Sequence, residues 1–203
     1  MFHEIWLKHF LDCMLALVAL INPISKIFII STLSEKADFK QIRQVALRAS
    51  LVAILILIFF SVAGNIILRN IFHVQIYAFK IAGGLVLLYR GFEALNKGVF
   101  FEFDENMKLA DMSIVPLASP MIAGPATISA SLSFPVKYGI FMTSIAIIAA
   151  VLINLIIMLY SGAISRVLTR HGFMGALIRI TGLVVATIGI QMVLDGISDY
   201  RLL

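Results

Sequence analysis

Six long apolar runs, separated by short charged segments, limit what this chain can fold into more than any other feature. They cover approximately residues 13–33, 46–68, 75–95, 113–133, 139–163 and 174–195. Each approaches or exceeds the roughly 20 residues that a helix needs to cross the hydrocarbon core of a bilayer. Hydrophobic residues make up 61% of the chain and charged residues 13%, which excludes a soluble globular domain. We therefore expect an all-α polytopic membrane protein, with one membrane domain over residues 1–203.

The distribution of lysine and arginine predicts how the chain is oriented, because these residues accumulate on the cytoplasmic side of a membrane. One side of the predicted spans holds Lys36, Lys40, Arg43, Arg48, Arg90, Lys97, Lys108, Arg166 and Arg170. The opposite side holds only Lys8, Arg69, Lys137 and Arg201. We therefore predict a multi-pass protein of the inner (plasma) membrane, with both termini outside and the polar linker 96–112 in the cytoplasm.

Several functions are disfavoured by the same sequence. The net charge of +5 comes without a basic stripe interleaved with aromatic residues, so nucleic acid is not an expected partner. The four histidines lie near span ends or in loops, and no metal-binding motif or nucleophile–base pair is present. We expect no enzyme activity, no metal and no cofactor. The expected partners are the lipid bilayer and a small-molecule substrate, and a homo-oligomer is compatible with the sequence.

Asn22-Pro23 interrupts the first apolar run near its middle. Proline removes a backbone donor and clashes with the carbonyl four residues earlier, so a continuous helix is disfavoured there. Unpaired backbone groups are costly in hydrocarbon, and a break is tolerated only where protein or a water-filled cavity covers it. For one such break taken alone, an ordinary proline kink is the favoured explanation.

An internal repeat gives this break a partner in the second half of the chain. Asn22-Pro23-Ile24 aligns with Ser119-Pro120-Met121, and Lys80-Ile81-Ala82-Gly83 aligns with Arg179-Ile180-Thr181-Gly182. Residues 1–95 and 113–203 then form two three-helix repeats. Because three spans are an odd number, the second repeat is inverted relative to the first. We expect six transmembrane helices in two inverted three-helix repeats, with broken first and fourth helices.

Both breaks have the composition of a helix start in mid-membrane. Asn and Ser are favoured N-cap residues, and Pro is favoured at the first helical position. A helix N-terminus offers free N–H groups and partial positive charge to an anion such as a carboxylate. The predicted substrate-binding residues are Asn22, Pro23, Ser25, Ser119, Pro120, Gly124, Pro125 and Thr127.

Other noteworthy residues in the apolar runs favour structural interpretations. Gly83, Gly84 and Gly182 are typical of close helix packing. Lys26 is expected to extend its charged end to the cytoplasmic membrane surface, with a binding role as the alternative.

At the two breaks the sequence resembles the MarC family of bacterial and archaeal inner-membrane proteins. Its motifs, Asn-Pro-Ile-Gly-x-Ile-Pro and Pro-Leu-Ala-x-Pro-x-x-x-Gly-Pro, stand here as residues 22–28 (NPISKIF) and 116–125 (PLASPMIAGP). Ser25 and Phe28 replace the usual Gly and Pro of the first motif. The resemblance covers essentially the whole chain and implies a plan similar to that of LysE-type amino-acid exporters. It also implies transport of a small neutral amino acid, as described for some members.

The sequence therefore predicts a secondary transporter of a small solute, most consistent with glycine or alanine. Its two inverted repeats would rock against each other and expose the site to each side in turn. A passive channel for small solutes and a non-transporting membrane scaffold remain alternatives. No acidic residue falls in the middle of a span, so the sequence does not indicate a coupling ion.

Overall fold

The computed structural model describes residues 2–34, 38–98, 114–170 and 174–201, and all regular structure within these ranges is helical. Most of the predicted linker 96–112 lies outside the described residues. The chain forms α1 (Phe2–Ile21), α2 (Pro23–Ser34), α3 (Phe39–Ile66), η1 (Ile67–Ile71), α4 (Ile76–Lys97), η3 (Ile114–Ile122), α5 (Pro125–Tyr138), α6 (Ile140–Arg170) and α7 (Met174–Arg201). The segments η1 and η3 are π-helical.

The apolar runs predicted from the sequence fall on these helices, but the helices are not all alike. In the described residues, three are long and apolar enough to cross a membrane: α3, α6 and α7, over Phe39–Gly64, Ile140–Arg166 and Gly175–Arg201. The first and fourth runs are each divided into two shorter helices, and α4 carries Lys80, Arg90 and Glu93 within its 22 residues. Length and composition therefore identify half of the six predicted spans directly.

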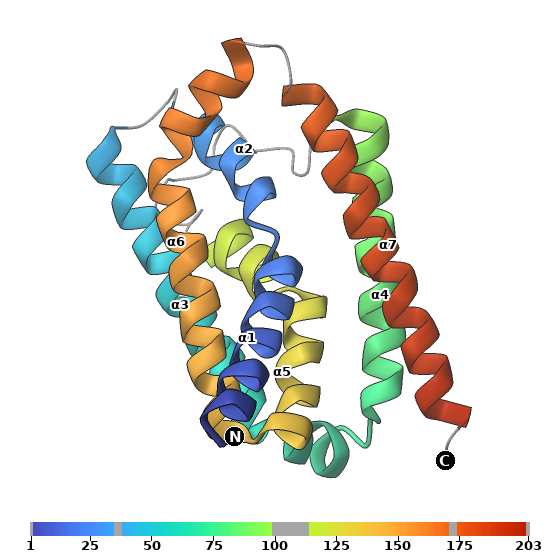
Figure 1. The fold of residues 1–203 in the computed structure, drawn as a ribbon. Helices are drawn as coiled ribbons and strands as arrows, with labels where there is room; N and C mark the ends of the chain where they lie inside the picture. Colours follow the sequence, from blue (N-terminus) through green and yellow to red (C-terminus); the bar gives the residue numbers. More distant parts are fainter. Residues whose placement is uncertain (1, 35–37, 99–113, 171–173, 202–203) are drawn as a thin grey trace.

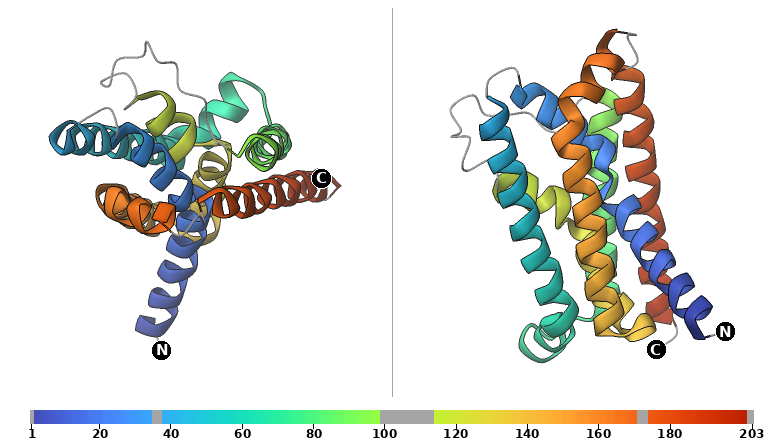
Figure 2. Two further views of the ribbon diagram at one scale, coloured as in Figure 1. Left: turned by 90° about the horizontal axis from the view of Figure 1, so that it is seen from above. Right: turned by 60° about the vertical axis from the view of Figure 1, so that its left-hand side comes forward.

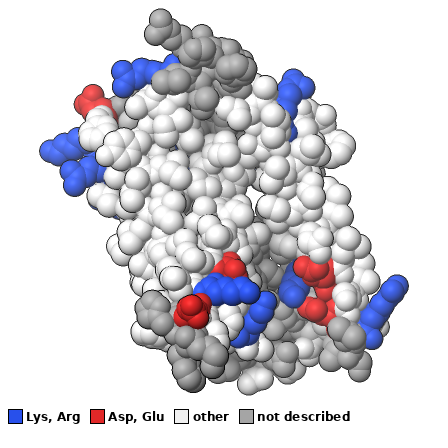
Figure 3. All heavy atoms as spheres, viewed as in Figure 1, with Lys and Arg blue, Asp and Glu red and all other residues white. Residues whose placement is uncertain are grey.

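The outer surface of the helices is apolar between two charged ends. Charged side chains gather at the upper and lower ends in Figure 3, and the band between them is almost free of charge. On α3, successive turns expose Leu51, Leu55 and Phe59, each more than half exposed. Large exposed apolar areas of this kind are rare on soluble monomers. The surface is that of an integral membrane protein, whose exposed apolar side chains contact lipid.

Both termini lie at the same end of the molecule (Figure 1). The main hydrophobic core joins α1, α2, α3, η3, α5 and α6. Its fully buried members include Leu17 on α1, Leu57 on α3 and Ile147 on α6. No described residue of α4 or α7 belongs to this core, so these two helices form a separate layer of the structure.

α4 and α7 lie side by side in antiparallel directions (Figures 1 and 2). Glycines bring their backbones together: a Cβ added to Gly84 would lie 2.5 Å from the carbonyl oxygen of Gly189. One added to Gly91 would lie 2.6 Å from the carbonyl oxygen of Gly182. These distances are too short for any side chain, so the glycines are required by the packing. The predicted packing role of Gly83, Gly84 and Gly182 is confirmed, with Gly83 packed closely against Pro125 of α5.

Candidate functional site

The first helix break lies where the sequence predicts it. α1 ends at Ile21, α2 begins at Pro23, and Asn22 between them has a φ of 55°. Asn is one of the few non-glycine residues that adopt this left-handed conformation readily. The buried Nδ2 atom of the Asn22 side chain has no hydrogen-bond partner in the described part of the chain. A buried amide donor of this kind is costly unless another group, such as a ligand or water, accepts its hydrogen bond.

Ser25 stabilises this first break from one turn further along. Its hydroxyl donates a 2.8 Å hydrogen bond to the Asn22 carbonyl oxygen, which also accepts a bond from the Ser25 backbone N–H. Ser25 is 4% exposed. The hydroxyl therefore adds a second hydrogen bond to the carbonyl at which α2 begins.

The second break lies at Gly124-Pro125, and the prediction that a helix begins at Ser119-Pro120 is wrong. Ser119 and Pro120 lie inside η3, joined by a cis peptide bond, and α5 begins at Pro125 with Gly124 as its N-cap. The start of α2 at Pro23 therefore corresponds to the start of α5 at Pro125. A Cβ on Gly124 would lie 2.3 Å from the Pro120 carbonyl oxygen, so the chain needs glycine at this point.

Thr127 holds the second break together from the third residue of α5. Its Oγ1 accepts a 2.8 Å hydrogen bond from the Gly124 N–H and lies 2.7 Å from the Ile122 carbonyl oxygen, to which it donates. The side chain is 1% exposed. This threonine supplies hydrogen bonds to two backbone groups that the end of η3 and the start of α5 leave unpaired.

Lys26 connects the two breaks, and the prediction that it extends to the membrane surface is wrong. The side chain is 2% exposed. Its Nζ donates to the carbonyl oxygen of Ile21 at the end of α1 and, over 2.8 Å, to that of Met121 near the end of η3. The side chain turns inward because it contacts η3. The position of a lysine near the end of an apolar run does not predict such a contact with a distant segment.

A cavity of about 150 Å³ lies at the junction of the two breaks. The breaks form one side of it, and α4 and α7 form the other through Val86, Leu87, Arg90 and Val185. Of the residues predicted to bind substrate, Asn22, Ser25, Pro120 and Pro125 line the cavity. Pro23, Ser119, Gly124 and Thr127 are not among its lining residues.

The sequence interpretation assigned no site role to the α4 side of this cavity. Val86 and Arg90 are four residues apart and therefore share one face of α4, a spacing that is visible in the sequence. What the sequence does not show is that this face is opposite the breaks. Gly83, one turn earlier, packs against Pro125 and brings α4 to this position.

The charge around the cavity is positive. Two cationic residues, Lys26 and Arg90, line it, and no acidic residue is among its lining residues. Arg90 is partly neutralised by a 2.8 Å ion pair with Glu93, the next turn of α4. In a low-dielectric environment, positive charge favours an anionic group over a cationic one.

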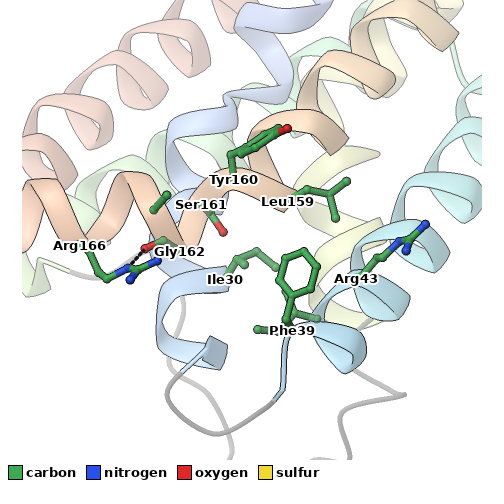
Figure 4. Close-up of a pocket in the computed structure, with 10 residues that line it drawn as sticks. Ile30, Phe39, Arg43, Leu159, Tyr160, Ser161, Gly162 and Arg166 are labelled. Atoms are coloured by element: carbon green, nitrogen blue, oxygen red, sulfur yellow. Dashed lines mark hydrogen bonds between the residues drawn. The ribbon is translucent and has the colours of Figure 1, made fainter.

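A larger cavity of about 450 Å³ lies between α2, α3 and α6, at the end of the molecule remote from the termini (Figure 4). Two of its polar groups are already used within α6: the Ser161 hydroxyl donates to the Met158 carbonyl oxygen, and Arg166 Nε donates to the Gly162 carbonyl oxygen. None of the residues predicted to bind substrate lines it. The smaller cavity, which combines helix breaks with an unpaired amide, is the better candidate site.

The fold and the cavity define a class of protein, a helical integral membrane protein with two broken helices that meet at one cavity. The chain belongs to the MarC family: the profile of the MarC family of integral membrane proteins matches residues 7–200. The resemblance inferred from the two motifs is therefore confirmed.

Curated relatives cover nearly the whole chain. A UPF0056 membrane protein of Pyrococcus horikoshii is 33% identical over 190 residues, which is 94% of each chain. One from Buchnera aphidicola is 30% identical over 206 residues, covering 96% of this chain and 93% of the relative. One from Bacillus subtilis is 29% identical over 197 residues, covering 91% and 92%. No solved structure gives a significant match.

Proposed function

We propose that the protein is a secondary transporter of a small solute, with a small neutral amino acid such as glycine or alanine as its substrate. The observation that carries this proposal is the cavity at the junction of the two helix breaks. Transporters of several folds bind their substrates at discontinuous helices near the bilayer midplane. The names of the relatives support a membrane protein and say nothing of a substrate.

The charge and the helix ends at the cavity support a substrate that carries a carboxylate. α2 and α5 both begin there, since Asn22 and Pro125 line the cavity, and helix N-termini favour anions. Lys26 and Arg90 add positive charge. In the proposed complex, the substrate carboxylate accepts hydrogen bonds from the Asn22 amide and from free backbone N–H groups of the two first turns.

The size of the cavity supports a small substrate. A cavity of about 150 Å³ is large enough for a molecule the size of benzene. Its apolar wall, formed by Val86, Leu87 and Val185, suits a hydrogen or a methyl group as the substrate side chain.

The order of the helices supports an inverted repeat. Each half contains, in order, a broken pair, a long unbroken helix and a helix of the α4–α7 pair: α1–α2, α3 and α4, then η3–α5, α6 and α7. Helix breaks at Pro23 and Pro125 then occupy corresponding positions. Inverted halves of this kind are common in secondary transporters.

The packing of α4 on α7 favours a particular form of alternating access. Each half contributes one helix to this pair, and their backbones touch at Gly84 and Gly91. We therefore expect α4 and α7 to move as one unit against the core formed by the other helices, instead of one half rocking against the other. The cavity lies between these two units and would open to each side in turn.

The proposed orientation places both termini outside the cell. The helix ends remote from the termini in Figure 1 are the start of α3, with Lys40 and Arg43, the last turn of α4, with Lys97, and the end of α6, with Arg166. Such a bias is expected for the cytoplasmic side. A cysteine introduced at an exposed position near Arg43, in a chain without Cys13, is expected to react with a membrane-impermeant thiol reagent only after the membrane is opened.

Uptake of labelled glycine and alanine into proteoliposomes tests the function. We expect saturable uptake that unlabelled substrate inhibits. Asn22→Gly removes the amide but retains a residue that adopts a φ of 55° without strain, so uptake should fall at least about tenfold while thermal stability is little changed. Asn22→Ala should also abolish uptake, with an added loss of stability from backbone strain. Unchanged uptake in Asn22→Gly would contradict the proposed site.

The same assay separates a transporter from a passive pore or a scaffold. A pore gives flux that rises linearly with substrate concentration and that an excess of a second substrate does not inhibit. A scaffold gives no flux above that of empty liposomes. Saturation together with competition supports the transporter, and either of the other results excludes it.

A further inference from the structure

Lys26 is the most deeply buried cationic group in the described part of the chain, and its environment is unusual for a lysine. Its Nζ contacts three backbone carbonyl oxygens: those of Ile21, of Asn22 at 3.4 Å and of Met121 at 2.8 Å. No acidic side chain of the described residues forms an ion pair with it. The charge is therefore compensated by backbone dipoles alone.

Two of these oxygens, those of Ile21 and Met121, are left over by the helix breaks, whereas the Asn22 oxygen also accepts hydrogen bonds from Ser25. Ile21 is the last residue of α1, and Met121 lies at the end of η3. In a regular α-helix the Met121 carbonyl would accept from the N–H of residue 125, which is a proline and has none. The C-terminal ends of helices also carry partial negative charge. Two broken helices thus present a small group of electronegative oxygens at one point.

Such a group of oxygens has the chemistry of a monovalent cation site. In transporters with broken helices, unwound backbone carbonyls and the C-terminal ends of half-helices coordinate the coupling sodium ion. A neutral amine has two N–H donors, whereas an ammonium has three and matches the three acceptors here. We propose that the ammonium of Lys26 is a tethered internal cation that occupies the place of a sodium ion.

The proposal has two consequences. In the natural protein, Lys26 occupies the cluster of carbonyl oxygens and no sodium ion can enter it. Sodium therefore does not stabilise the fold or drive transport. Replacement of Lys26 by a small residue vacates the oxygens and creates a site for a sodium-sized cation. The expectation that sodium does not drive transport rests on the function proposed above, whereas the expected effects of sodium on stability do not.

Thermal unfolding of the purified protein in detergent tests the proposal without any substrate. At equal ionic strength, the Tm of the natural protein should be the same in sodium chloride and in choline chloride. Lys26→Ala should unfold at a lower temperature in choline chloride, and sodium should raise its Tm saturably, by about 3 °C or more. Lys26→Arg keeps a cation in place and should show no sodium effect. Lys80→Ala, which removes a lysine elsewhere, is the matched control and should not respond to sodium.

Either of two results would overturn the proposal: a sodium-specific rise in Tm for the natural protein, or no sodium response in Lys26→Ala. If Lys26→Ala does not fold, Lys26→Ser is used, with the same expected result. In proteoliposomes, alanine uptake by the natural protein should be unchanged when choline replaces sodium, whereas uptake by Lys26→Ala should require sodium. Absence of any uptake would refute the transport function and would leave the result of the Tm measurement standing.

Discussion

The two halves of the chain meet in two regions that are built in opposite ways. At the helix breaks they meet through buried polar groups, with Lys26 of α2 bound to the Met121 carbonyl of η3. At the α4–α7 pair they meet through glycines, with backbone against backbone at Gly84 and Gly189. The first region leaves a cavity, whereas the second leaves no room for a single additional carbon at these glycines.

This difference indicates which region binds and which one transmits motion. Hydrogen bonds to irregular backbone can be exchanged for bonds to a ligand, and the unpaired Asn22 amide is already available for one. Close backbone packing has no such alternative partner and holds two helices in a fixed register. Substitutions in the α4–α7 pair should therefore affect folding most, and those at the breaks should affect function as well.

The largest loss of stability is expected for Gly91→Leu, which separates α4 from α7. A Cβ at this position would lie 2.5 Å from the Ala186 backbone nitrogen, so the helices must move apart. We expect a loss of stability of about 3 kcal/mol or more. Gly175→Leu is the matched control, because no atom of another described segment lies within 4 Å of its added Cβ, and it should be nearly neutral. Equal Tm values for the two variants would refute the rigid contact.

A smaller effect is expected when the second helix break loses its internal cap. Thr127→Val keeps the shape of the side chain but leaves the Gly124 N–H and the Ile122 carbonyl unpaired. The expected loss is about 1–3 kcal/mol, measured by thermal or denaturant unfolding in detergent. Thr187→Val removes an exposed hydroxyl that bonds only within α7 and should cost less than about 0.5 kcal/mol. A larger loss for Thr187→Val would reverse the comparison.

The smallest effect should come from the ion pair at the end of the α4–α7 pair that lies near the termini. Lys80 Nζ lies 2.7 Å from Asp199 Oδ2, and both side chains are partly exposed. Asp199→Asn should therefore reduce stability by no more than about 1 kcal/mol, less at high salt. A double-mutant cycle with Lys80→Met measures the coupling. A coupling energy above about 2 kcal/mol would show that charge, and not glycine packing, holds the pair together.

The sequence predicts the first break and the glycine contacts because each has a local cause. Asn22-Pro23 couples a residue that tolerates positive φ with one that lacks an N–H, and glycines spaced along α4 and α7 indicate close packing. The sequence does not locate the second break correctly, because residues 119–125 contain two prolines. The helix begins at Pro125 because Gly124 precedes it and Thr127 caps the Gly124 N–H. A threonine two residues after a Gly-Pro pair is therefore the signal in the sequence that identifies this helix start.

The roles of Lys26 and Arg90 could not be predicted in the same way. Both depend on contacts between segments far apart in the sequence, with Met121 opposite Lys26 and the breaks opposite Arg90. A charged side chain near the end of an apolar run is normally expected to reach the membrane surface. Only the packing of α4 and η3 around the first break shows that these two cations border one cavity.

The central claim, that the cavity at the two breaks binds the substrate, is tested most directly by filling it. Val86→Trp places a large side chain at the α4 wall, and Val184→Trp places one on the exposed surface of α7, outside the cavity lining. Equilibrium binding of labelled glycine and alanine should be lost in Val86→Trp and retained in Val184→Trp, with similar Tm values. Binding with unchanged affinity in a folded Val86→Trp variant would contradict the account.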